Sequence, residues 1–364
     1  MIVLGSTGSI GTAALDVARR FSLEVETLVA GTNADLLNRQ IEEFCPKRVV
    51  VADRDTAQKV RFAKVGYGQE AILSAIEESQ SPLAINAIVG FLGLKPTLKA
   101  LECGKTLALA NKESLVCAGR YIDASAIRPI DSEHFGLKYL IADRAIRRLI
   151  VTASGGALRD TPIEEIERSP IESVLKHPNW NMGAKITIDS ATMVNKLFEI
   201  LEARWLFGGY KIDAVIEKSS TIHAMIEFED GCITAQASSA DMRLAIAYAV
   251  LGDLSEPIAG RIEPCSLEAI RFLPIDERRY PVWSIKGQLQ NTPELGVVVN
   301  AANEAALGLY RDRKIPFGAI ARTVLAAFER FSVPPASIDE VFAIHNDVER
   351  WAAKSALHCK AQSS

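Results

Sequence analysis

The first residues of the chain combine a short apolar run with a glycine-rich turn, and this limits the possible folds more than any other feature. Residues 1–4 are apolar, Gly5–Gly11 follow the pattern GxxGxxG, and residues 12–21 show helical periodicity. A strand, a glycine turn and a helix in this order are typical of the first unit of a dinucleotide-binding fold, because glycine lets the backbone approach a pyrophosphate. A turn that only packs a strand on a helix is the alternative. The sequence therefore predicts a dinucleotide-binding domain at the N-terminus.

Changes of pattern divide the rest of the chain. Strand-like runs alternate with amphipathic segments up to about residue 130, which predicts parallel βαβ units; the runs are Met1–Leu4, Glu24–Val29, Arg48–Ala52, Leu83–Ile88 and Thr106–Ala110. Residues 131–270 mix helices with alternating strands, such as Ala214–Glu217, Thr221–Glu227 and Cys232–Ser238. Prolines mark 271–296 as a linker, and 297–364 have helical periodicity. We predict an α/β protein with a Rossmann-like parallel-sheet domain (1–130), a central α+β domain (131–270), a linker (271–296) and a C-terminal helical domain (297–364).

Charge and cysteine usage exclude several classes of partner. The net charge of −4 gives no basic surface for nucleic acid or an anionic membrane. Apolar stretches such as 85–94 are too short to span a bilayer, and a strand starting at Ile2 leaves no room for a signal peptide. The six cysteines are scattered without a CxxC pair, as expected of thiols in a reducing compartment. We expect a cytoplasmic protein.

The end of the second predicted strand indicates which dinucleotide is bound. NAD enzymes usually have an acidic residue there, which binds the ribose hydroxyls. In this chain residues 28–30 are apolar and are followed by Gly31, Thr32 and Asn33. The missing carboxylate favours NADP, whereas Asp35 is the residue that would support NAD.

Two acidic clusters follow further along the chain. Asp131 and Glu133 are two residues apart, so on an extended chain their side chains share a face. A helix predicted over 190–205, with Asp189 or Ser190 as N-cap and Gly208 beyond its end, places Asn195 and Glu199 one turn apart. Carboxylates without cysteine or histidine ligands suit Mg²⁺ or Mn²⁺. Taken alone, solvated surface acids are the more ordinary interpretation of these residues.

Specific sequence strings change that balance. The chain resembles the 1-deoxy-D-xylulose 5-phosphate reductoisomerase family over nearly its whole length, in the family's motif order. The strings are Gly5–Gly11, Leu109–Leu115, Asp131–His134, Ser154–Gly156, His177–Trp180, Asp189–Met193 with Asn195 and Lys196, Ala240–Arg243, and Asn300–Glu304.

This resemblance implies a role for each matched residue. The metal ligands would be Asp131, Glu133 and Glu199. Near the reacting carbons, Lys112, Ser132, Glu133 and Glu199 would contact substrate, with Lys112 as a charge stabiliser and Glu133 as a proton shuttle. The substrate phosphate would be bound by Ser154, His177, Ser190, Asn195 and Lys196, with Ser190 at a helix N-terminus. The cofactor contacts would be Thr7, Gly8, Ser9, Ile10, Gly31, Thr32, Asn33, Asn111, Glu113 and Gly183.

The resemblance also implies an activity and an assembly. The family rearranges 1-deoxy-D-xylulose 5-phosphate and reduces the product with NADPH to 2-C-methyl-D-erythritol 4-phosphate, an isoprenoid precursor, with a divalent cation such as Mg²⁺ or Mn²⁺. It further implies that residues 154–185, which contain Trp180, are a mobile flap over a phosphorylated sugar substrate. A homodimer formed through the central sheet is also implied.

Some residues depart from the family pattern, and two other functions stay open. Thr32 stands where the family often has a lysine, Ala157–Leu158 replace a Pro-Phe pair, and Ala240 replaces a proline. One alternative is an aspartate-semialdehyde-dehydrogenase-like enzyme with Cys117 as nucleophile, although no activating base is evident near it. The other is a non-catalytic NADP-sensing module. The remaining histidines, His134, His223, His345 and His358, are interpreted as structural.

Overall fold

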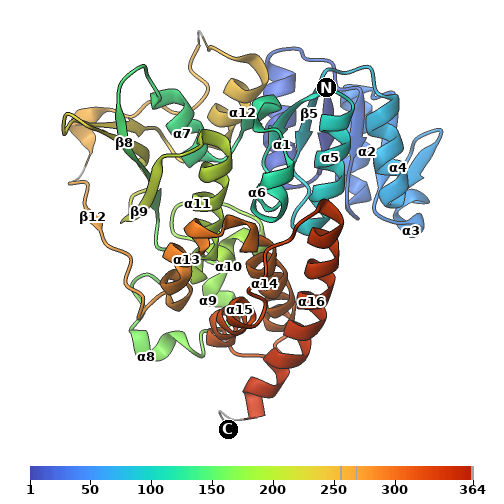
Figure 1. Ribbon diagram of the computed structural model, residues 1–364. Helices are drawn as coiled ribbons and strands as arrows, with labels where there is room; N and C mark the ends of the chain where they lie inside the picture. Colours follow the sequence, from blue (N-terminus) through green and yellow to red (C-terminus); the bar gives the residue numbers. More distant parts are fainter. Residues whose placement is uncertain (255, 268, 362–364) are drawn as a thin grey trace. The chain divides into compact units, whose positions relative to one another are not determined.

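The computed structural model describes residues 1–254, 256–267 and 269–361, and they form two compact units (Figure 1). The first unit contains Met1–Ser114, Asp123–Phe135 and Asp241–Arg261; the second contains Leu115–Ile122, Gly136–Ala240 and the chain from Ile262 onward. The side chains of His358 and Cys359 lie outside the described part of the chain. The functions predicted for the individual domains remain predictions. Residues 241–261, which the sequence pattern placed in the central domain together with 131–240, belong to the first unit.

A seven-stranded, wholly parallel sheet forms the centre of the first unit. Its strand order is β4-β3-β2-β1-β5-β6-β7, so the order reverses beside β1. The strands are β1 (Ile2–Leu4), β2 (Thr27–Val29), β3 (Arg48–Val51), β4 (Val65–Tyr67), β5 (Leu83–Asn86), β6 (Thr106–Leu109) and β7 (Ile127–Pro129). In parallel sheets of this type, ligands bind at the carboxyl ends of the strands where the order reverses.

Helices connect and cover these strands. They are α1 (Ser9–Arg20), α2 (Ala34–Phe44), α3 (Arg54–Ala57), α4 (Gly68–Glu78), α5 (Leu94–Glu102), α6 (Lys112–Ala118) and α12 (Met242–Leu251). Helix α1 starts at Ser9, three residues earlier than predicted, because Gly8 O already accepts the N–H of Thr12 at 2.9 Å. Helix α12 adds Ile246 and Ala247 to the same apolar core as Val3 and Leu15, which is why residues 241–261 belong to this unit.

The second unit has a mixed five-stranded sheet in the order β11-β10-β8-β9-β12. Strand β8 (Ile146–Ala153) lies parallel to β9 (Lys211–Glu217) and antiparallel to β10 (Ile222–Phe228). The edges are β11 (Ile233–Ala237) and β12 (Phe272–Leu273), both antiparallel to their neighbours. The sequence-based strands in 214–238 are confirmed to within a few residues.

Helices make up most of the remaining second unit. They are α8 (Ile163–Ile166), α9 (Ile171–Val174), α10 (Ala184–Thr192), α11 (Val194–Phe207), α13 (Lys286–Asn291), α14 (Gly296–Arg311), α15 (Gly318–Arg330) and α16 (Ile338–Ala361), and α7 (Ser132–Leu140) leads into this unit. The predicted α/β class, with its parallel sheet, α+β part and helical C-terminal part, is confirmed. Within the described residues, the structure contains no helix long and apolar enough to cross a membrane.

The segment predicted as a linker is an integral part of the second unit. Tyr280, Val282 and Trp283 are buried there, because their side chains are apolar or aromatic and the 3-10 helix Pro281–Ile285 turns them inward. The Tyr280 hydroxyl donates to Gly155 O at 2.8 Å, and burial raises the pKa of Tyr280 to about 12. This buried hydrogen bond fixes the turn that follows β8.

The glycine turn after β1 is packed backbone against backbone. Gly5 has φ +87°, and a Cβ there would lie 2.6 Å from Ala87 O. A Cβ on Gly11 would lie 2.2 Å from Gly5 O and 2.5 Å from Ser6 Cα. A Cβ on Gly8 would meet Gly5 O at 3.4 Å, an ordinary contact. Two glycines are therefore required by the turn itself, while the middle one leaves space at the turn's outer side.

We expect Gly11→Ala to lower the free energy of unfolding by about 2 kcal/mol or more, because the methyl group would overlap backbone atoms that have no room to move. The matched control is Gly8→Ala in the same turn, where φ is −80° and the change should be within about 0.5 kcal/mol. Urea unfolding of the three proteins measures both values. Equal losses for the two variants would contradict this account of the turn.

Candidate functional site

The residues predicted to contact the cofactor in the first unit lie at one edge of its sheet. Thr7, Gly8, Ser9 and Ile10 form the turn from β1 into α1, and Gly31, Thr32 and Asn33 form the turn from β2 into α2. Asn111 and Glu113 follow β6. Since all seven strands are parallel, these loops lie at the same carboxyl edge. The Gly5 and Ser6 N–H groups each donate to Val29 O at 2.8 Å, which ties the first loop to the second.

Two of the predicted cofactor residues use their side chains to shape the loops. Asn33 Oδ1 accepts the Leu36 N–H at 3.1 Å and thereby caps α2. The buried Asn111 amide donates to the carbonyls of Ile88 (2.7 Å) and Gly90 (2.8 Å). These amides hold the loops in place, whereas Gly31 and Thr32 are exposed at the edge.

The first acidic cluster is built at the start of α7, still within the first unit. Asp131 follows β7, and its carbonyl accepts the Phe135 N–H at 2.8 Å, so α7 begins at Ser132. The prediction that Asp131 and Glu133 share a face of an extended chain is wrong in its geometry, because a helical turn brings them together. Carboxylate oxygens of the two residues nevertheless lie within 4.8 Å of each other.

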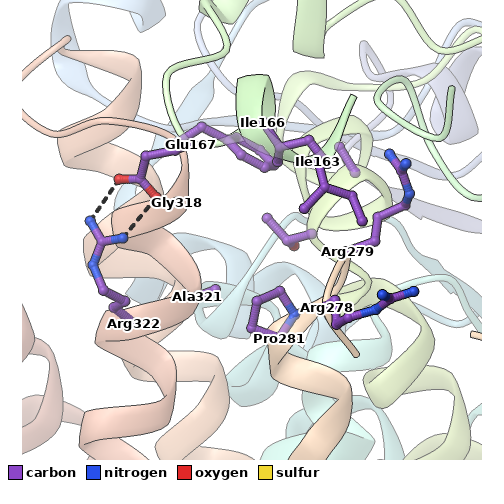
Figure 2. A pocket seen from close by; sticks show the side chains of 12 residues that line it. Ile163, Ile166, Glu167, Arg278, Arg279, Pro281, Gly318, Ala321 and Arg322 are labelled. Atoms are coloured by element: carbon purple, nitrogen blue, oxygen red, sulfur yellow. Dashed lines mark hydrogen bonds and ion pairs between the residues drawn. The ribbon is translucent and has the colours of Figure 1, made fainter. Parts of the chain in front are cut away.

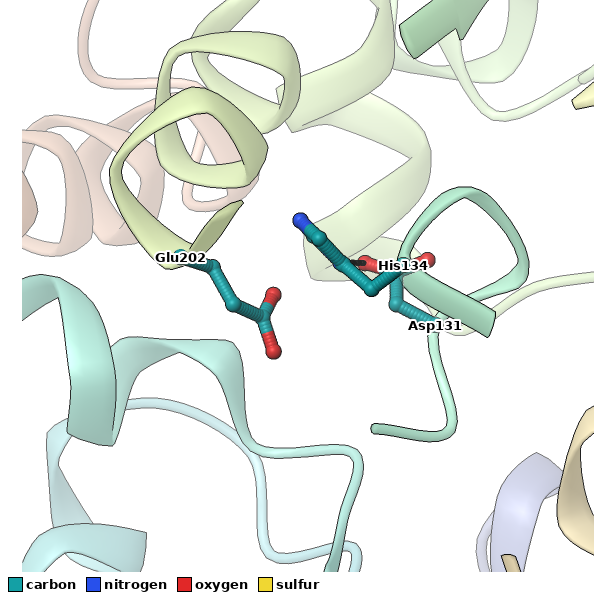
Figure 3. A group of neighbouring side chains, drawn as sticks. All are labelled: Asp131, His134 and Glu202. Atoms are coloured by element: carbon teal, nitrogen blue, oxygen red, sulfur yellow. Dashed lines mark ion pairs between the residues drawn. The ribbon is translucent and has the colours of Figure 1, made fainter. Parts of the chain in front are cut away.

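Polar and charged neighbours fix this first cluster. The Lys112 ammonium group, buried in the first turn of α6, forms an ion pair with the Asp131 carboxylate. Figure 3 shows the His134 ring beside Asp131, with Nδ1 3.8 Å from the carboxylate. The Ser132 hydroxyl donates to Glu133 Oε2 at 2.6 Å. The cluster thus consists of a Lys112–Asp131 ion pair and a Ser132–Glu133 hydrogen bond, and the two carboxylates lie within 4.8 Å of each other.

The second unit brings Ser154 and His177 together. The His177 Nδ1 atom accepts the backbone N–H groups of Asn179 (3.2 Å) and Trp180 (3.0 Å), so the proton of the neutral ring is on Nε2. That N–H donates to Ser154 Oγ at 2.8 Å, and the Gly156 N–H donates to the same oxygen at 3.1 Å. The Ser154 hydroxyl hydrogen is therefore available to an anionic acceptor.

His177 is neutral at physiological pH. Burial, and to a smaller extent the positive charge of Arg159, lower the pKa of its imidazole from 6.5 to about 4. The structure makes it an uncharged hydrogen-bond donor.

The predicted helix over 190–205 is in fact two helices. Met193 has φ +70° and separates α10 from α11. The Thr192 hydroxyl bonds back to Asp189 O at 3.1 Å and accepts the Val194 N–H at 3.4 Å, a local pattern that competes with helix continuation. Ser190 therefore lies in the last turn of α10, and the prediction that it starts a helix is wrong. The helix N-terminus in this region belongs to α11, whose first turn contains Asn195 and Lys196.

The predicted pairing on α11 is confirmed. The Asn195 amide donates to Glu199 Oε1 at 2.6 Å. The buried Lys196 ammonium contacts Glu199 Oε2 and the Thr152 carbonyl. A carboxylate and an ammonium group that are both buried are stable here because each satisfies the other.

The proposed flap, residues 154–185, has an anchored middle and a more open end. Ile166 and Val174 are buried in a core shared with α14 and α15. A pocket of about 160 Å³ is lined by residues of this segment and of α15, and two of the lining residues, Glu167 and Arg322, pair through two bonds of 2.8 and 2.9 Å (Figure 2). By contrast, Trp180 is partly exposed and contacts His223 edge to face at 5.8 Å, and Gly183 is exposed. His177 and Asn179 are tied by hydrogen bonds to Ser154 and Ser220, so movement of the flap would concentrate in residues 180–183.

Sequence reasoning missed the buried anchor of α10. Asp189 Oδ1 accepts from Asn303 Nδ2 at 2.7 Å, and Oδ2 accepts from Lys185 Nζ at 2.8 Å. Asp189 was considered only as a helix cap, and Asn303 only as part of a motif. The signal that could have revealed them is an acidic and an amide residue inside otherwise apolar helical segments, since buried polar groups require partners. Cys117, the alternative nucleophile, is buried at 2% exposure.

Comparisons with known families identify the chain's relatives. Residues 1–119 match the sequence model described as 1-deoxy-D-xylulose 5-phosphate reductoisomerase. Residues 127–207 match the model of the same enzyme's C-terminal domain, and residues 237–351 match a model described as DXP reductoisomerase C-terminal domain. The three matches cover most of the chain.

Individual relatives extend over almost the full length. The curated 1-deoxy-D-xylulose 5-phosphate reductoisomerases of Nautilia profundicola and Wolinella succinogenes are each 53% identical. The alignment with the first covers 96% of this chain and 98% of the relative, and that with the second covers 97% and 100%.

Solved structures agree with these sequence relationships. A crystal structure of DOX-P reductoisomerase in complex with NADPH, fosmidomycin and magnesium has a TM-score of 0.91 and 29% identity, covering 99% of this chain and 98% of the other. The 1-deoxy-D-xylulose 5-phosphate reductoisomerase of Zymomonas mobilis in complex with NADPH has a TM-score of 0.86 and 34% identity, with 98% of each chain covered.

The low pKa of His177 generates a pH-dependent prediction. Since the folded-state pKa lies below the unfolded value, the unfolded chain binds the proton first as the pH falls. The stability that neutral His177 provides is fully present above pH 6.5 and is lost as the pH falls toward about 4.

We expect a nuclear magnetic resonance titration to give a midpoint near 4 for the His177 ring, with His177→Gln identifying its signal. Urea unfolding at pH 7 and pH 5 should show a larger loss of stability in the wild type than in His177→Gln. A midpoint near 6.5 would refute the buried, neutral donor.

Proposed function

This chain belongs to the 1-deoxy-D-xylulose 5-phosphate reductoisomerase family, and from that premise we propose how its residues carry out the reaction. The enzyme converts 1-deoxy-D-xylulose 5-phosphate to 2-C-methyl-D-erythritol 4-phosphate in isoprenoid precursor synthesis, with NADPH and a divalent cation. One observation supports the assignment of residues. All the motif residues expected around the substrate are present, and within each unit these residues are already held by hydrogen bonds or ion pairs.

The glycine turn and its neighbouring loops fit a dinucleotide. Gly5 and Gly11 keep the turn close to the sheet, while Gly8 and Ser9 stay exposed at the start of α1. Thr7, Gly8, Ser9 and Ile10 would contact the pyrophosphate region, where free N–H groups at the helix start favour negative charge. Gly31, Thr32, Asn33, Asn111, Glu113 and Gly183 would complete the cofactor contacts. NADPH, when bound, supplies the hydride for the reduction.

The metal would be bound by Asp131, Glu133 and Glu199. Carboxylate oxygens are the ligands that Mg²⁺ and Mn²⁺ prefer, and Asp131 and Glu199 each contact a lysine in this structure. When bound, the cation supplies positive charge beside the carbonyl and hydroxyl oxygens of the substrate. Lys112 and Lys196, which now pair with two of these carboxylates, would remain beside them as further positive charge.

The substrate phosphate would be bound by Ser154, His177, Ser190, Asn195 and Lys196. Ser154 has a hydroxyl hydrogen to donate, and His177 orients that hydroxyl without adding charge. Lys196 supplies the full positive charge, and the first turn of α11 adds the favourable end of a helix dipole. Binding the phosphate away from the reacting carbons holds the substrate in register for both steps.

Proton movement would be the task of Glu133, with Lys112 stabilising negative charge on the substrate. Ser132 donates to Glu133 at 2.6 Å, so the hydroxyl can pass a proton between the substrate and the carboxylate. The ammonium group of Lys112 is buried and therefore acts in surroundings where its charge is little screened. The open end of the flap, with Trp180, would exclude water during reduction.

We also propose that the enzyme is a cytoplasmic homodimer. None of the described cysteines Cys45, Cys103, Cys117, Cys232 and Cys265 forms a disulfide, which supports a reducing compartment. Ile233, Phe272 and Leu273 are large apolar side chains on the second unit's sheet, and they are 57%, 44% and 41% exposed. Ile233 lies on the edge strand β11, and Phe272 and Leu273 lie on the opposite edge strand β12. Exposed apolar side chains at the edges of a sheet support association through it.

The metal assignment predicts a specific pattern of activity. NADPH oxidation with 1-deoxy-D-xylulose 5-phosphate should require Mg²⁺ or Mn²⁺, and Glu199→Gln should lower kcat/KM by at least about 100-fold, because it removes a charged ligand. Binding of Mn²⁺, measured by electron paramagnetic resonance, should weaken in the same variant. Metal-independent turnover or full activity of Glu199→Gln would overturn the assignment.

Two controls separate this mechanism from the alternatives. Cys117→Ser should keep wild-type turnover, whereas loss of activity would favour a dehydrogenase with a cysteine nucleophile. NADPH binding by Glu199→Gln should stay close to wild type, although the variant lowers the stability of the second unit because Lys196 loses its buried partner. Retained NADPH binding shows that the first unit is intact. A chain that binds NADPH but never turns over would instead support the sensing module.

The proposed dimer predicts a change in sedimentation. The wild type should sediment as a dimer, and Ile233→Lys should shift it toward the monomer, because the variant places a charge on the exposed edge strand β11. Val333→Lys is the matched control, since Val333 is 74% exposed in a loop away from that sheet. A monomeric wild type, or equal effects of both substitutions, would contradict the proposed interface.

A further inference from the structure

The loops after β2 and β3 lie side by side at the carboxyl edge of the parallel sheet. The register pairs Val29 with Val50. Hydrogen bonds continue this pairing beyond the strands, from Ala30 N to Val50 O (2.9 Å) and from Ala52 N to Gly31 O (3.3 Å). The loops of residues 31–33 and 52–54 therefore begin side by side. They lie at the same edge of the sheet as the glycine turn that follows β1.

The charges at this place are mostly negative. Asp35 lies in the first turn of α2, and Asp55 lies in the first turn of α3. Asp53 precedes α3 and accepts the Thr56 N–H at 2.7 Å, and this backbone hydrogen bond lowers the pKa of its carboxyl group. Thr32 contributes no charge. A phosphate group placed here would meet three carboxylates, so binding it requires a cation.

Arg54 is the cation that the edge provides. It is the first residue of α3 and is exposed, and no ion pair to it is found among the described residues. Other basic residues of this region are placed differently. Lys47 and Arg48 are at the opposite end of β3 and pair with Glu24 and Glu26, and Arg39 is in the middle of α2. Lys59 lies beyond the end of α3, and its charge acts on Asp53.

We propose that Arg54 binds the 2′-phosphate of NADPH and so determines the preference for NADPH over NADH. The inference rests on the proposed cofactor site. A guanidinium group can donate two parallel hydrogen bonds to a phosphate, which gives both charge and geometry. Arg54, in the loop after β3, thus supplies the positive charge that Thr32, in the loop after β2, lacks. This charge offsets the repulsion between the phosphate and the carboxylates of Asp35, Asp53 and Asp55.

The test compares binding of the two reduced cofactors, followed by nicotinamide fluorescence without substrate. Arg54→Met keeps much of the side-chain length and removes the charge. It should raise the Kd for NADPH by at least about tenfold, as expected for loss of a charged hydrogen-bonded pair, and change the Kd for NADH less than about twofold. The NADPH preference of the wild type should also decrease with added salt.

Two further variants make the result specific. Arg61→Met removes an equal charge from a neighbouring exposed arginine that pairs with Glu42, and it should leave the preference unchanged. Thr32→Lys in the Arg54→Met background should restore NADPH binding, because it returns a cation to the adjacent loop.

The outcomes distinguish this inference from the function on which it rests. Strong NADPH binding by Arg54→Met, equal weakening of both cofactors, or an equal effect of Arg61→Met would overturn the role of Arg54 alone. A wild-type chain that binds neither cofactor would overturn the proposed function as well. Thermal unfolding of each variant confirms that the fold is intact.

Discussion

Burial of charge is the constraint that most strongly shapes the functional regions of this protein. Lys112, Lys185 and Lys196 are largely withdrawn from water, and each contacts a carboxylate, on Asp131, Asp189 and Glu199 respectively. An isolated charge in such surroundings would cost several kcal/mol, so the members of each pair depend on one another. The same pairs fix the side chains that the reaction needs. Stability and preorganisation are thus produced by the same contacts.

Much of the fold could be predicted because its signals are local. The GxxGxxG turn specified β1, its connection and α1, and long apolar runs gave the strands that are buried on both faces. The pattern failed where tertiary contacts decide. Strand β4 contains Gly66 and has no buried residue, and β7 combines Arg128 with Pro129, so neither strand has the apolar run that marks β1 and β2. The break at Met193 depends on a left-handed residue and on Thr192 hydrogen bonds, and neither changes the apolar periodicity of 190–205.

The candidate site shows the same limit. Motif residues such as Ser154, His177 and Glu199 could be named from the sequence, because their identities carry the resemblance. Their protonation and hydrogen bonding could not be predicted. The neutrality of His177, for example, follows from burial and from backbone N–H groups that only the folded chain places at Nδ1. The capping role of Asn33 and the Asp189–Asn303 bond also depend on neighbours that spacing does not reveal.

The first unit is assembled from segments far apart in the chain, and this has a consequence for its synthesis. Helix α12 packs on α1 in the first unit. In the sequence, however, about a hundred residues of the second unit separate α12 from the last strand of the first unit's sheet. At roughly 5–20 residues per second, a ribosome needs on the order of 5–20 s to translate them. During that interval the growing chain exposes the apolar surface of α1 that α12 later covers. The nascent first unit therefore carries an uncovered apolar surface until residue 251 has left the ribosome.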